Sequence, residues 1–382
     1  MAYDPYKALY LHIPFCVRRC GYCDFATSAV ERDSPIIDEY VESLVMDIRR
    51  ASREGKLGAI ETVYLGGGTP SHIGMGRLSM LLYALSMSMH LEPEIECTME
   101  ANPESLTAPM VRDIWALGVN RLSIGVQSFD DEVLRILGRA HDADAARAAV
   151  RAAQERFENV SVDLMCGIPG QSAESFAESV REAVALGVTH VSVYPLTIEP
   201  HTPFDRAVMR GEMDEPDEDV EAAAMEDARL ILEDAGFHRY EVASYARPGF
   251  ESTAYWTGKP YLGLGRSAVT MTQNAERRMR VQDGQVVEDL DARQMAAEDL
   301  MLGMRMARGV SDEQVARAAA VIDDAASTAA SSGSMTPGSE TGSVLAAFDE
   351  LASLGLAKHA DGRWRPTDAG WLCGNELYDL AP

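Results

Sequence analysis

The sequence has few basic residues for its length, and this shortage excludes two classes of partner. Its 382 residues include 34 Lys and Arg against 60 Asp and Glu, which gives a formal net charge of −26. A chain of this charge repels phosphate backbones and anionic lipids at long range. Only short Arg clusters interrupt the acidic composition. We therefore expect neither nucleic acid nor a membrane surface among its partners.

No apolar run in the sequence approaches the length of about 18 residues that a helix needs to cross a membrane. The first residues, MAYDPYKALYLHIPFC, also lack the basic segment and the following apolar segment of a signal peptide. We therefore expect a cytoplasmic protein with no transmembrane segment.

Cysteine is scarce, and its six residues are unevenly placed. Cys16, Cys20 and Cys23 lie together, whereas the other three are scattered along the chain. In a reducing compartment, cysteines in such an arrangement are not expected to form a disulfide framework. The group near the N-terminus is therefore the informative one.

The remaining composition is that of a globular protein, with 46% hydrophobic and 25% charged residues. A chain of 382 residues is too long for one ordinary core. We therefore expect two domains, or one large domain with a smaller appendage.

Short β-rich segments alternate with helical patterns over the first half of the chain. The strand candidates are residues 9–13, 62–66, 95–101, 121–127, 160–165 and 191–196. Between the first two, Ser34 can cap a helix, Pro35 suits its first turn, and apolar residues recur at helical spacing up to Ile48. Strands separated by crossover helices predict a parallel sheet.

Alternation within these strands indicates which face of the sheet the helices cover. Leu9 and Leu11 share one face with other apolar residues. The opposite face is polar and includes Tyr10, Glu100, Gln127 and Asp163. A parallel sheet covered on both sides would be apolar on both faces, and an ordinary eight-stranded barrel would be filled with branched side chains. We therefore predict an α/β fold, a (β/α)6 partial TIM barrel whose lumen holds a polar ligand.

The pattern changes after residue 196. We predict three parts, namely the partial barrel at 1–210, an extension of the barrel at 211–290 and a C-terminal domain at 291–382. In the extension, residues 217–235 are typical of a helix with a charged face, and residues 240–245 and 261–265 of added strands.

The C-terminal domain is predicted as a small winged-helix-like α+β unit. A helix at 292–307 opens it, and residues 357–366 form a hairpin around Asp361 and Gly362. Residues 325–343, AASTAASSGSMTPGSETGS, cannot bury enough apolar surface to become ordered, so we predict a flexible insertion. The acidic charge of the chain favours a packing or partner role over DNA contact.

The segment CVRRCGYC places Cys16, Cys20 and Cys23 on one short loop directly after the first predicted strand. Three thiolates at this spacing can bind three irons of an iron–sulfur cube and leave the fourth iron without a protein ligand. Zinc is the main rival, but a closed zinc site needs a fourth ligand. His12 is a candidate for that ligand, although it lies in the strand and faces the lumen. The three cysteines favour the cluster and leave zinc open.

The spacing CxxxCxxC is the signature of the radical S-adenosylmethionine (SAM) enzymes, and its flanks are more specific. Over nearly its whole length, the chain resembles the oxygen-independent coproporphyrinogen III oxidase-like family. The matching segments, in order, are LYLHIPFCVRRCGYCDF, VYLGGGTPS, TMEANPESL, RLSIGVQSFDDEVLRILGRAH, VDLMCGIPGQ, YPLTIEPHTPF, YEVASYARPG and EDLMLGMRMARGV. The resemblance implies a radical SAM protein with a [4Fe-4S] cluster.

In that family the open iron binds the amino and carboxylate groups of SAM, and an electron from the cluster splits the sulfonium to give a 5′-deoxyadenosyl radical. The resemblance implies that Cys16, Cys20 and Cys23 ligate the cluster. The residues that it implies as SAM contacts are Tyr10, Tyr22, Gly67, Gly68, Thr69, Glu100, Gln127, Arg139 and Asp163. No catalytic residue is assigned.

Phe25 separates two branches of this family. True coproporphyrinogen oxidases resemble one another in a further cysteine two residues after the third, where this chain has Phe25. The chain is thus more similar to the heme chaperone (HemW-type) branch, to which heme delivery to acceptor proteins is attributed. The alternative is an oxidoreductase acting on coproporphyrinogen III or another tetrapyrrole.

The same resemblance implies several partners. They are heme or another tetrapyrrole, a heme-acceptor protein that the sequence does not name, and an electron donor such as a flavodoxin or ferredoxin. A homodimer is left open.

The chain departs from that branch in its heme motif. The branch usually carries HNxxYW, whereas this chain has RPGFESTAYW. Tyr255 and Trp256 are kept, but Glu251 and Ser252, or a short deletion, stand in place of His and Asn. The aromatic pair predicts contact with heme without strong axial ligation, and therefore weaker heme binding. Further candidate iron ligands, each more often structural, are His190, His201, His238 and Cys166.

Overall fold

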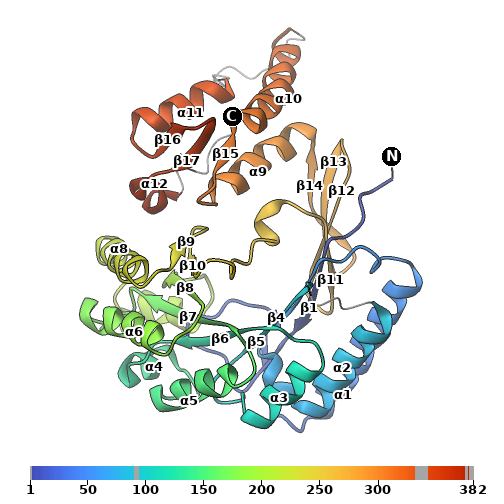
Figure 1. Ribbon diagram of the computed structural model, residues 1–382, viewed down its shortest axis with the longest axis vertical. Helices are drawn as coiled ribbons and strands as arrows, with labels where there is room; N and C mark the ends of the chain where they lie inside the picture. The colour runs from blue at the N-terminus through green and yellow to red at the C-terminus, as the bar shows by residue number, and fades with distance from the viewer. Residues whose placement is uncertain (1, 90–93, 332–342, 375–376, 378–382) are drawn as a thin grey trace.

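The computed structural model describes residues 2–89, 94–331, 343–374 and 377. Its first half contains six parallel strands. They are β1 (Ala8–Ile13), β4 (Thr62–Gly67), β5 (Glu96–Ala101), β6 (Arg121–Gln127), β7 (Asn159–Cys166) and β8 (His190–Pro195). Each lies on a predicted strand, and the ends agree to within about one residue. Figure 1 shows these strands as one curved sheet, so the predicted partial barrel is confirmed.

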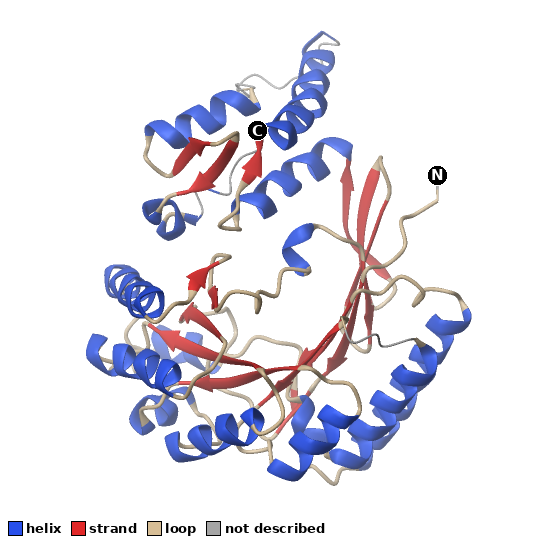
Figure 2. Cartoon of the chain, viewed as in Figure 1, coloured by secondary structure: helices blue, strands red, loops and turns tan. Residues whose placement is uncertain are grey.

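Helices cover the outer face of this sheet. The short helix α7 (Pro203–Met209) instead contacts Gly21 of the loop after β1. The covering helices are α1 (Pro35–Arg53), α2 (Met75–Ser88), α3 (Ala108–Ala116), α4 (Asp131–Leu137), α5 (Ala143–Gln154), α6 (Ala173–Ala185) and, after β8, α8 (Glu218–Asp234). Figure 2 shows them along the convex side of the curved strands. Helices on one side explain why the strands alternate between apolar and polar residues.

α1 illustrates how the outer layer packs. Its side chains Ile37 and Ile48 are fully buried in the same apolar core as Leu11 of β1. Pro35 occupies the first turn, as predicted. Ser34 precedes the helix, but its side chain makes no capping hydrogen bond. Ser34 is therefore the N-cap residue by position, with its backbone carbonyl accepting from Ile37 N at 3.1 Å, but the predicted side-chain cap is not formed.

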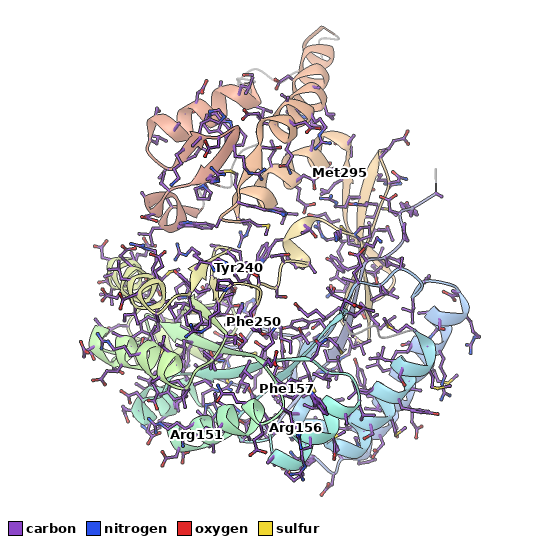
Figure 3. The ribbon with its side chains drawn as sticks, in the orientation of Figure 1. Arg151, Arg156, Phe157, Tyr240, Phe250 and Met295 are labelled. Carbon is purple, nitrogen blue, oxygen red and sulfur yellow. The ribbon has the colours of Figure 1, made fainter. Side chains whose placement is uncertain are left out.

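The inner face of the sheet is polar, and part of it is also buried. Ser161 and His190 are at most 1% exposed. The two side chains are joined by a 2.7 Å hydrogen bond, and the other ring nitrogen of His190 lies 2.8 Å from the Tyr240 hydroxyl. Figure 3 shows Tyr240 and Phe250 on the inner side of the sheet, and Arg151 and Arg156 with the outer helices. Ser161 and His190 are thus buried but paired, as their desolvation requires.

Further strands extend the barrel sheet at both edges. On one edge they are β11 (Tyr261–Leu264), which runs parallel to β1, and then β12 (Val269–Gln273), β13 (Arg277–Gln282) and β14 (Gln285–Asp291), which run antiparallel. On the other edge are β10 (Ser244–Ala246) and β9 (His238–Arg239). In the described part of the chain, the order is β14-β13-β12-β11-β1-β4-β5-β6-β7-β8-β10-β9.

Two features of this extension differ from the sequence prediction. Of the strand expected at 240–245, the last two residues belong to β10, whereas residues 240–243 form a turn between β9 and β10, in which Tyr240 N donates to Ser244 O at 3.2 Å. The hairpin β13–β14 was not predicted, although Asp283 and Gly284 at its tip both have positive φ, the signature of an Asp-Gly hairpin turn. The predicted strand at 261–265 is confirmed as β11.

The C-terminal region has its own apolar core, which includes Val310, Phe348 and Trp364. Its elements are α9 (Ala292–Met304), β15 (Val310–Ser311), α10 (Asp312–Ser331), α11 (Val344–Ser353), β16 (Ala357–Ala360), β17 (Arg363–Pro366) and α12 (Asp368–Leu372). Asp361 and Gly362 form the predicted hairpin turn between β16 and β17. Figure 1 shows this region facing the open, inner side of the barrel sheet. Its winged-helix character stays a prediction, as do the domain boundaries.

The predicted flexible insertion at 325–343 differs in part from the structure. α10 continues to Ser331 and therefore includes the first residues of that segment; Ala and Ser there cost a helix little. Residues 332–342 lie outside the described residues, and Ser343 caps α11 by accepting from Ala346 N. Among the helices described, none is long and apolar enough to cross a membrane.

Candidate functional site

The loop with Cys16, Cys20 and Cys23 follows the carboxyl end of β1. It begins at the short strand β2 (Phe15–Cys16), which pairs with β3 (Ser28–Ala29). At its centre, Gly21 N donates to Leu137 O at 3.3 Å, and a Cβ on Gly21 would lie 2.2 Å from the Phe204 ring. The loop is thus packed against the end of α4 and the start of α7, where a larger residue than glycine does not fit.

All six cysteines are free thiols, and the three in the loop fit an iron–sulfur cluster. Burial raises the pKa of the Cys16 and Cys23 thiols above the usual value, so binding of a metal would have to displace their protons. Thr69 Oγ1 donates to Cys16 Sγ at 3.4 Å, and Arg139 Nη1 donates to Cys20 Sγ at 3.5 Å. Such donors stabilise thiolate ligands of a cluster.

His12 does not serve as the fourth ligand that zinc would need. Its Nδ1 lies 2.8 Å from the Tyr10 hydroxyl, and its Nε2 lies 3.2 Å from the Ala26 carbonyl. Both ring nitrogens are therefore occupied, and the residue is 6% exposed. No three His, Cys, Asp or Glu side chains form a single-ion site within the residues that the structure describes. The donor set suits three separate irons better than one zinc ion.

A continuous chain of hydrogen bonds links Cys16 to Cys20. From Thr69, which donates to Cys16, the chain passes to Asn102, whose Nδ2 donates to Thr69 Oγ1 at 3.0 Å. Arg139 Nη2 donates to Asn102 Oδ1 at 2.7 Å and to the Gly125 carbonyl at 2.6 Å. We call Thr69, Asn102 and Arg139 the rim network. It ties the cysteine loop to the carboxyl ends of β4, β5 and β6.

Asn102 is the member of the rim network that the sequence reasoning missed. It follows directly after β5, within the segment TMEANPESL that carried the family resemblance. A polar residue just past the carboxyl end of a parallel strand is a usual place for a functional side chain. That position was the signal that would have identified it.

Gln127 lies beside the same network. It has a φ of 67°, at a break in the register between β6 and β7. A Cβ built on Gly125 would lie 3.1 Å from Gln127 Nε2 and 2.8 Å from Asn102 Oδ1. Gly125 thus leaves room for both side chains, and the predicted inward position of Gln127 is where the structure places it.

Glu100 is at the centre of a second group of inward side chains. It accepts from the Tyr64 hydroxyl at 2.8 Å and from Gly67 N at 3.0 Å. Burial raises the pKa of Glu100 to about 7, against the effect of these two hydrogen bonds. Tyr10 is nearby, with its ring centre 6.2 Å from that of Tyr64. Near neutral pH, this carboxyl group can therefore hold or release a proton.

Gly67 and Gly68 are required by the chain itself. Gly67 has a φ of 106°, and a Cβ on it would lie 2.4 Å from the His12 ring. A Cβ on Gly68 would lie 2.7 Å from both the Ile13 carbonyl and Phe15 N. These close approaches hold the end of β4 against the cysteine loop. Packing alone accounts for both glycines, and their contact with SAM stays a prediction.

Asp163 and Tyr22 lie in different surroundings. Burial raises the pKa of Asp163, whose oxygens accept from Ser123 Oγ at 3.4 Å in the lumen. Tyr22 instead packs on Phe204, with ring centres 6.3 Å apart. It belongs to a small apolar cluster beneath the loop, whose other members include Leu137 and Leu196. The predicted residues therefore lie in the lumen, around the rim network or around Glu100 and Asp163, with the exception of Tyr22, which lies in the apolar cluster.

Further into the lumen are polar groups to which no role was assigned. Arg121 is 4% exposed, and its Nη1 donates to Thr98 Oγ1 at 3.4 Å. Glu241 is 2% exposed, and burial raises its pKa. Within the described residues, Arg121 Nε and Glu241 Oε2 have no hydrogen-bond partner. Unpaired buried polar atoms are costly, which is consistent with a lumen shaped for a polar ligand.

The candidate heme ligands divide into two buried and two accessible residues. His190 uses both ring nitrogens in hydrogen bonds, and burial lowers its pKa. Cys166 is fully buried, which raises its pKa to about 12. His201 is exposed with a φ of 66°, and His238 Nε2 pairs with Glu251 Oε1 at 2.7 Å. Only the latter two can be reached by a ligand without repacking.

The segment that replaces the heme motif is tied to the barrel through its two substituted positions. Besides His238, Glu251 accepts from Gly249 N at 3.1 Å. Ser252 Oγ donates to Glu96 Oε1 of β5 at 2.8 Å. The short helix η2 (Tyr255–Thr257) then presents Tyr255, which is 64% exposed. Its ring meets Trp256 edge-on, with centres 5.3 Å apart.

Comparisons with known proteins agree with this geometry. The profile of the Radical SAM superfamily matches residues 10–183. "Heme chaperone HemW" of Synechocystis sp. is 34% identical over 333 residues, 81% of this chain and 80% of that protein. "Heme chaperone HemW" of Bacillus subtilis is 30% identical over 393 residues, 97% and 98% of the two chains.

Among solved structures, coproporphyrinogen III oxidase (HemN) from Escherichia coli has a TM-score of 0.77 to this chain. The aligned region covers 98% of this chain and 90% of the HemN chain, at 21% sequence identity. At this identity the likeness shows a shared fold, which includes the region that follows the barrel.

Proposed function

The chain belongs to the heme chaperone HemW family of the radical SAM superfamily, and from this premise we propose that it binds heme and passes it to an acceptor protein. In this proposal the barrel holds a [4Fe-4S] cluster and SAM, and heme binds at Tyr255 and Trp256. The observation that carries the proposal is the rim network, which fixes two of three free thiols at the mouth of a polar lumen.

Cys16, Cys20 and Cys23 would hold the cluster. When bound, it supplies an iron without a protein ligand and an electron for SAM. The protein's own part is to orient the loop and shield it. Phe204 and Leu137 pack beneath the loop, and the hydroxyl of Thr69 and the guanidinium of Arg139 donate to its sulfurs.

We place SAM against the two inward groups, with Arg139 and Gln127 on one side and Glu100 on the other. The Nε of Arg139 is buried and has no hydrogen-bond partner among the described residues, so this cation still has a donor for a carboxylate. Asp163 and Tyr10 would bound the site within the lumen. This arrangement combines a cation, an amide and carboxyl groups, which suits a ligand that carries an amino group, a carboxylate and a ribose.

Anaerobic reconstitution followed by heme titration tests the proposal. The reconstituted protein should contain about four irons and four sulfides at the cysteine loop, with SAM changing the spectrum of the cluster. Heme should bind with a spectrum that lacks bis-histidine character. Stoichiometric zinc with no iron uptake, or a protein that binds no heme, would contradict it.

The alternative is an active oxidoreductase acting on coproporphyrinogen III or another tetrapyrrole. Phe25, which stands where a further cysteine would be, is 65% exposed beside the loop and offers no sulfur. We therefore favour the chaperone. Conversion of coproporphyrinogen III by the reconstituted protein, with SAM consumed, would decide for the oxidoreductase.

An electron donor such as a flavodoxin or ferredoxin and a cytoplasmic location complete the proposal. Six free cysteines in the structure are consistent with a reducing compartment. The acceptor protein is to be identified by heme transfer from the loaded chaperone.

A further inference from the structure

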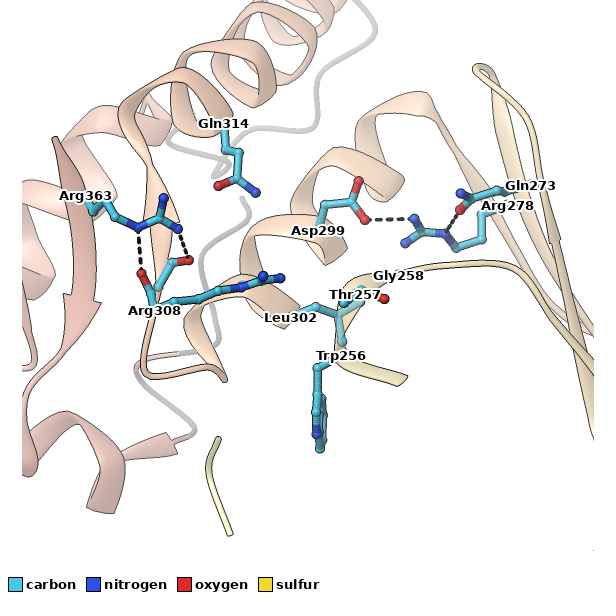
Figure 4. Close-up of a pocket in the computed structure, with 12 residues that line it drawn as sticks. Trp256, Thr257, Gly258, Gln273, Arg278, Asp299, Leu302, Arg308, Gln314 and Arg363 are labelled. Atoms are coloured by element: carbon cyan, nitrogen blue, oxygen red, sulfur yellow. Dashed lines mark hydrogen bonds and ion pairs between the residues drawn. The ribbon is translucent and has the colours of Figure 1, made fainter. Parts of the chain in front are cut away.

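A cavity of about 400 Å³ lies outside the barrel lumen, between the barrel extension and the C-terminal region. Figure 4 shows it, with Trp256 and Gly258 on one side, Asp299 and Leu302 of α9 on another, and Arg308 and Arg363 on the C-terminal side. Its size is within the range of pockets for small molecules. We call it the Arg308 cavity.

The acidic groups on α9 are neutralised by arginines of β13. Arg278, which is 2% exposed, donates to Asp299 Oδ1 at 2.8 Å and to Gln273 Oε1 at 3.0 Å, and also pairs with Glu298. Arg280 pairs with Glu298 at 2.6 Å. Both carboxylates are therefore engaged on the strand side.

Arg308 is the cation on that opposite wall, and its backbone is fixed. Arg363 donates to the Arg308 carbonyl at 2.8 Å and to the Gly309 carbonyl at 3.0 Å. Gly309 has a φ of 59°, and a Cβ on it would lie 1.8 Å from the Trp364 carbonyl. The loop that carries Arg308 is therefore held against β17, and only glycine fits next to it.

The side chain of Arg308 extends from this fixed loop toward the middle of the cavity in Figure 4. Over the parts of the chain that the structure describes, no carboxylate or carbonyl accepts from its guanidinium. Arg308 is solvent-exposed, so its guanidinium at the cavity is accessible to a ligand. It is available for an anion, and a guanidinium pairs best with a carboxylate or phosphate that takes two hydrogen bonds.

An aromatic wall adjoins this cation. Trp256 lines the cavity, and the Arg305 guanidinium lies 4.9 Å from the centre of its ring. Tyr255, edge-on to Trp256, is exposed on the outside. A flat ring bound at the aromatic pair lies at the edge of the cavity that Arg308 also lines.

We propose that the Arg308 cavity binds a carboxylate of a planar tetrapyrrole, with Arg308 as the ion-pair partner of a propionate of heme whose ring lies at Tyr255 and Trp256. This inference rests on the proposed function, since it takes heme as the ligand. It makes Arg308 a positioning and affinity residue for heme. The substrate class that follows is a tetrapyrrole with free propionates.

The test compares heme with its dimethyl ester, in which both propionates are neutral. Each is titrated into the full chain, its Arg308→Gln variant and a matched control, Arg317→Gln, and the Soret absorbance gives the Kd. Arg317 lies on α10, exposed, with Glu313 at 3.9 Å. Loss of one charged hydrogen-bonded pair is expected to weaken heme binding about tenfold. Arg308→Lys keeps the positive charge but not the planar guanidinium with its two parallel donors. It should therefore bind heme more tightly than Arg308→Gln but more weakly than the natural chain.

The ester supplies the decisive comparison. The natural chain should bind the ester about tenfold more weakly than heme, and Arg308→Gln should not weaken ester binding further. Heme binding that changes neither with esterification nor with Arg308→Gln would overturn the inference and leave the proposed function standing. A natural chain that binds neither compound would overturn both.

Discussion

The cysteine loop and the segment at 249–258 both carry proposed ligand contacts, but their side chains are held in different ways. Around the loop, the rim network joins Thr69 and Asn102, which follow β4 and β5, to Arg139, which donates to a carbonyl of β6, and each donor has a fixed acceptor. In the other segment, Tyr255 is exposed, and the pair His238–Glu251 is at the surface. A site built on strand ends is preorganised, whereas one on a connecting segment can change its residues without disturbing the core.

The largest expected effect is loss of the cluster. Replacing Cys16, Cys20 or Cys23 with Ala should reduce the iron content after reconstitution from about four iron atoms per chain to near zero. The reason is that a [4Fe-4S] cluster with only two cysteine ligands is bound weakly. Iron and sulfide analysis measures this. Cys373→Ala, which removes a free cysteine far from the loop in sequence, is the control and should retain the full content. Full iron content in a loop variant would place the cluster elsewhere.

Arg139→Ala tests the rim network. It removes the donors to Cys20, Asn102 and the Gly125 carbonyl, and each buried group left unpaired costs about 1–3 kcal/mol. SAM affinity, measured by equilibrium dialysis, should fall at least tenfold. Substitutions of Glu100, Gln127 and Asp163 should also weaken SAM binding more than folding.

Arg181→Ala is the control for this substitution. Arg181 is an exposed arginine that pairs with Glu174 on the outer face, and its loss should leave SAM binding unchanged. Unchanged SAM affinity in all four lumen variants would show that the cofactor lies elsewhere.

The raised pKa of Glu100 predicts a pH dependence of stability. The folded group binds its proton up to about pH 7, whereas the usual value is 4.5. The folded state therefore holds more protons in this window, so the contribution of Glu100 to stability is greatest below pH 4.5 and is lost as pH rises to about 7.

Unfolding by denaturant at several pH values measures this slope. Glu100→Gln should flatten the slope between pH 5 and 8, whereas Glu174→Gln, on an exposed residue of α6, should not. An equal slope in Glu100→Gln would show that the group titrates normally.

The heme motif can be restored in the segment at 249–258. Insertion of His-Asn ahead of Thr253 creates HNTAYW and keeps the bonds of Glu251 and Ser252 to the barrel. Heme should bind several-fold more tightly and show a histidine ligand in its spectrum, while cluster and SAM binding stay unchanged. An Ala-Ala insertion at the same place is the control. Tight heme binding in the natural chain, insensitive to Tyr255→Ala and Trp256→Ala, would direct attention to His201 and His238.

The smallest effect concerns the pair His238–Glu251. Both side chains are partly exposed, at 44% and 30%, and such pairs contribute about 0–1 kcal/mol. His238→Gln should therefore change the free energy of unfolding by less than about 1 kcal/mol and leave the heme spectrum unchanged. A lost iron ligand in that spectrum would make His238 a heme ligand of this chain.

Sequence periodicity was a good guide to the barrel, because a parallel strand buried on one side must alternate and a crossover helix must present one apolar face. Leu9 and Leu11 face α1, and Glu100 and Asp163 face the lumen, as the alternation predicted. It was a poor guide where strands are short or exposed. β9 and β10 have two and three residues, too few for a pattern, and β13–β14 were missed although Asp283-Gly284 marks their turn.

The sequence by itself determined the three cysteines, the polar lumen and the family, because each is a property of residue type and spacing along the chain. Only the tertiary structure decided how these parts meet. Asn102 joins Thr69 to Arg139, and Arg308 and Trp256 line one cavity. The two hydrogen bonds of Asn102 connect residues that lie 33 and 37 positions apart, and such meetings depend on strand register and on packing between distant segments.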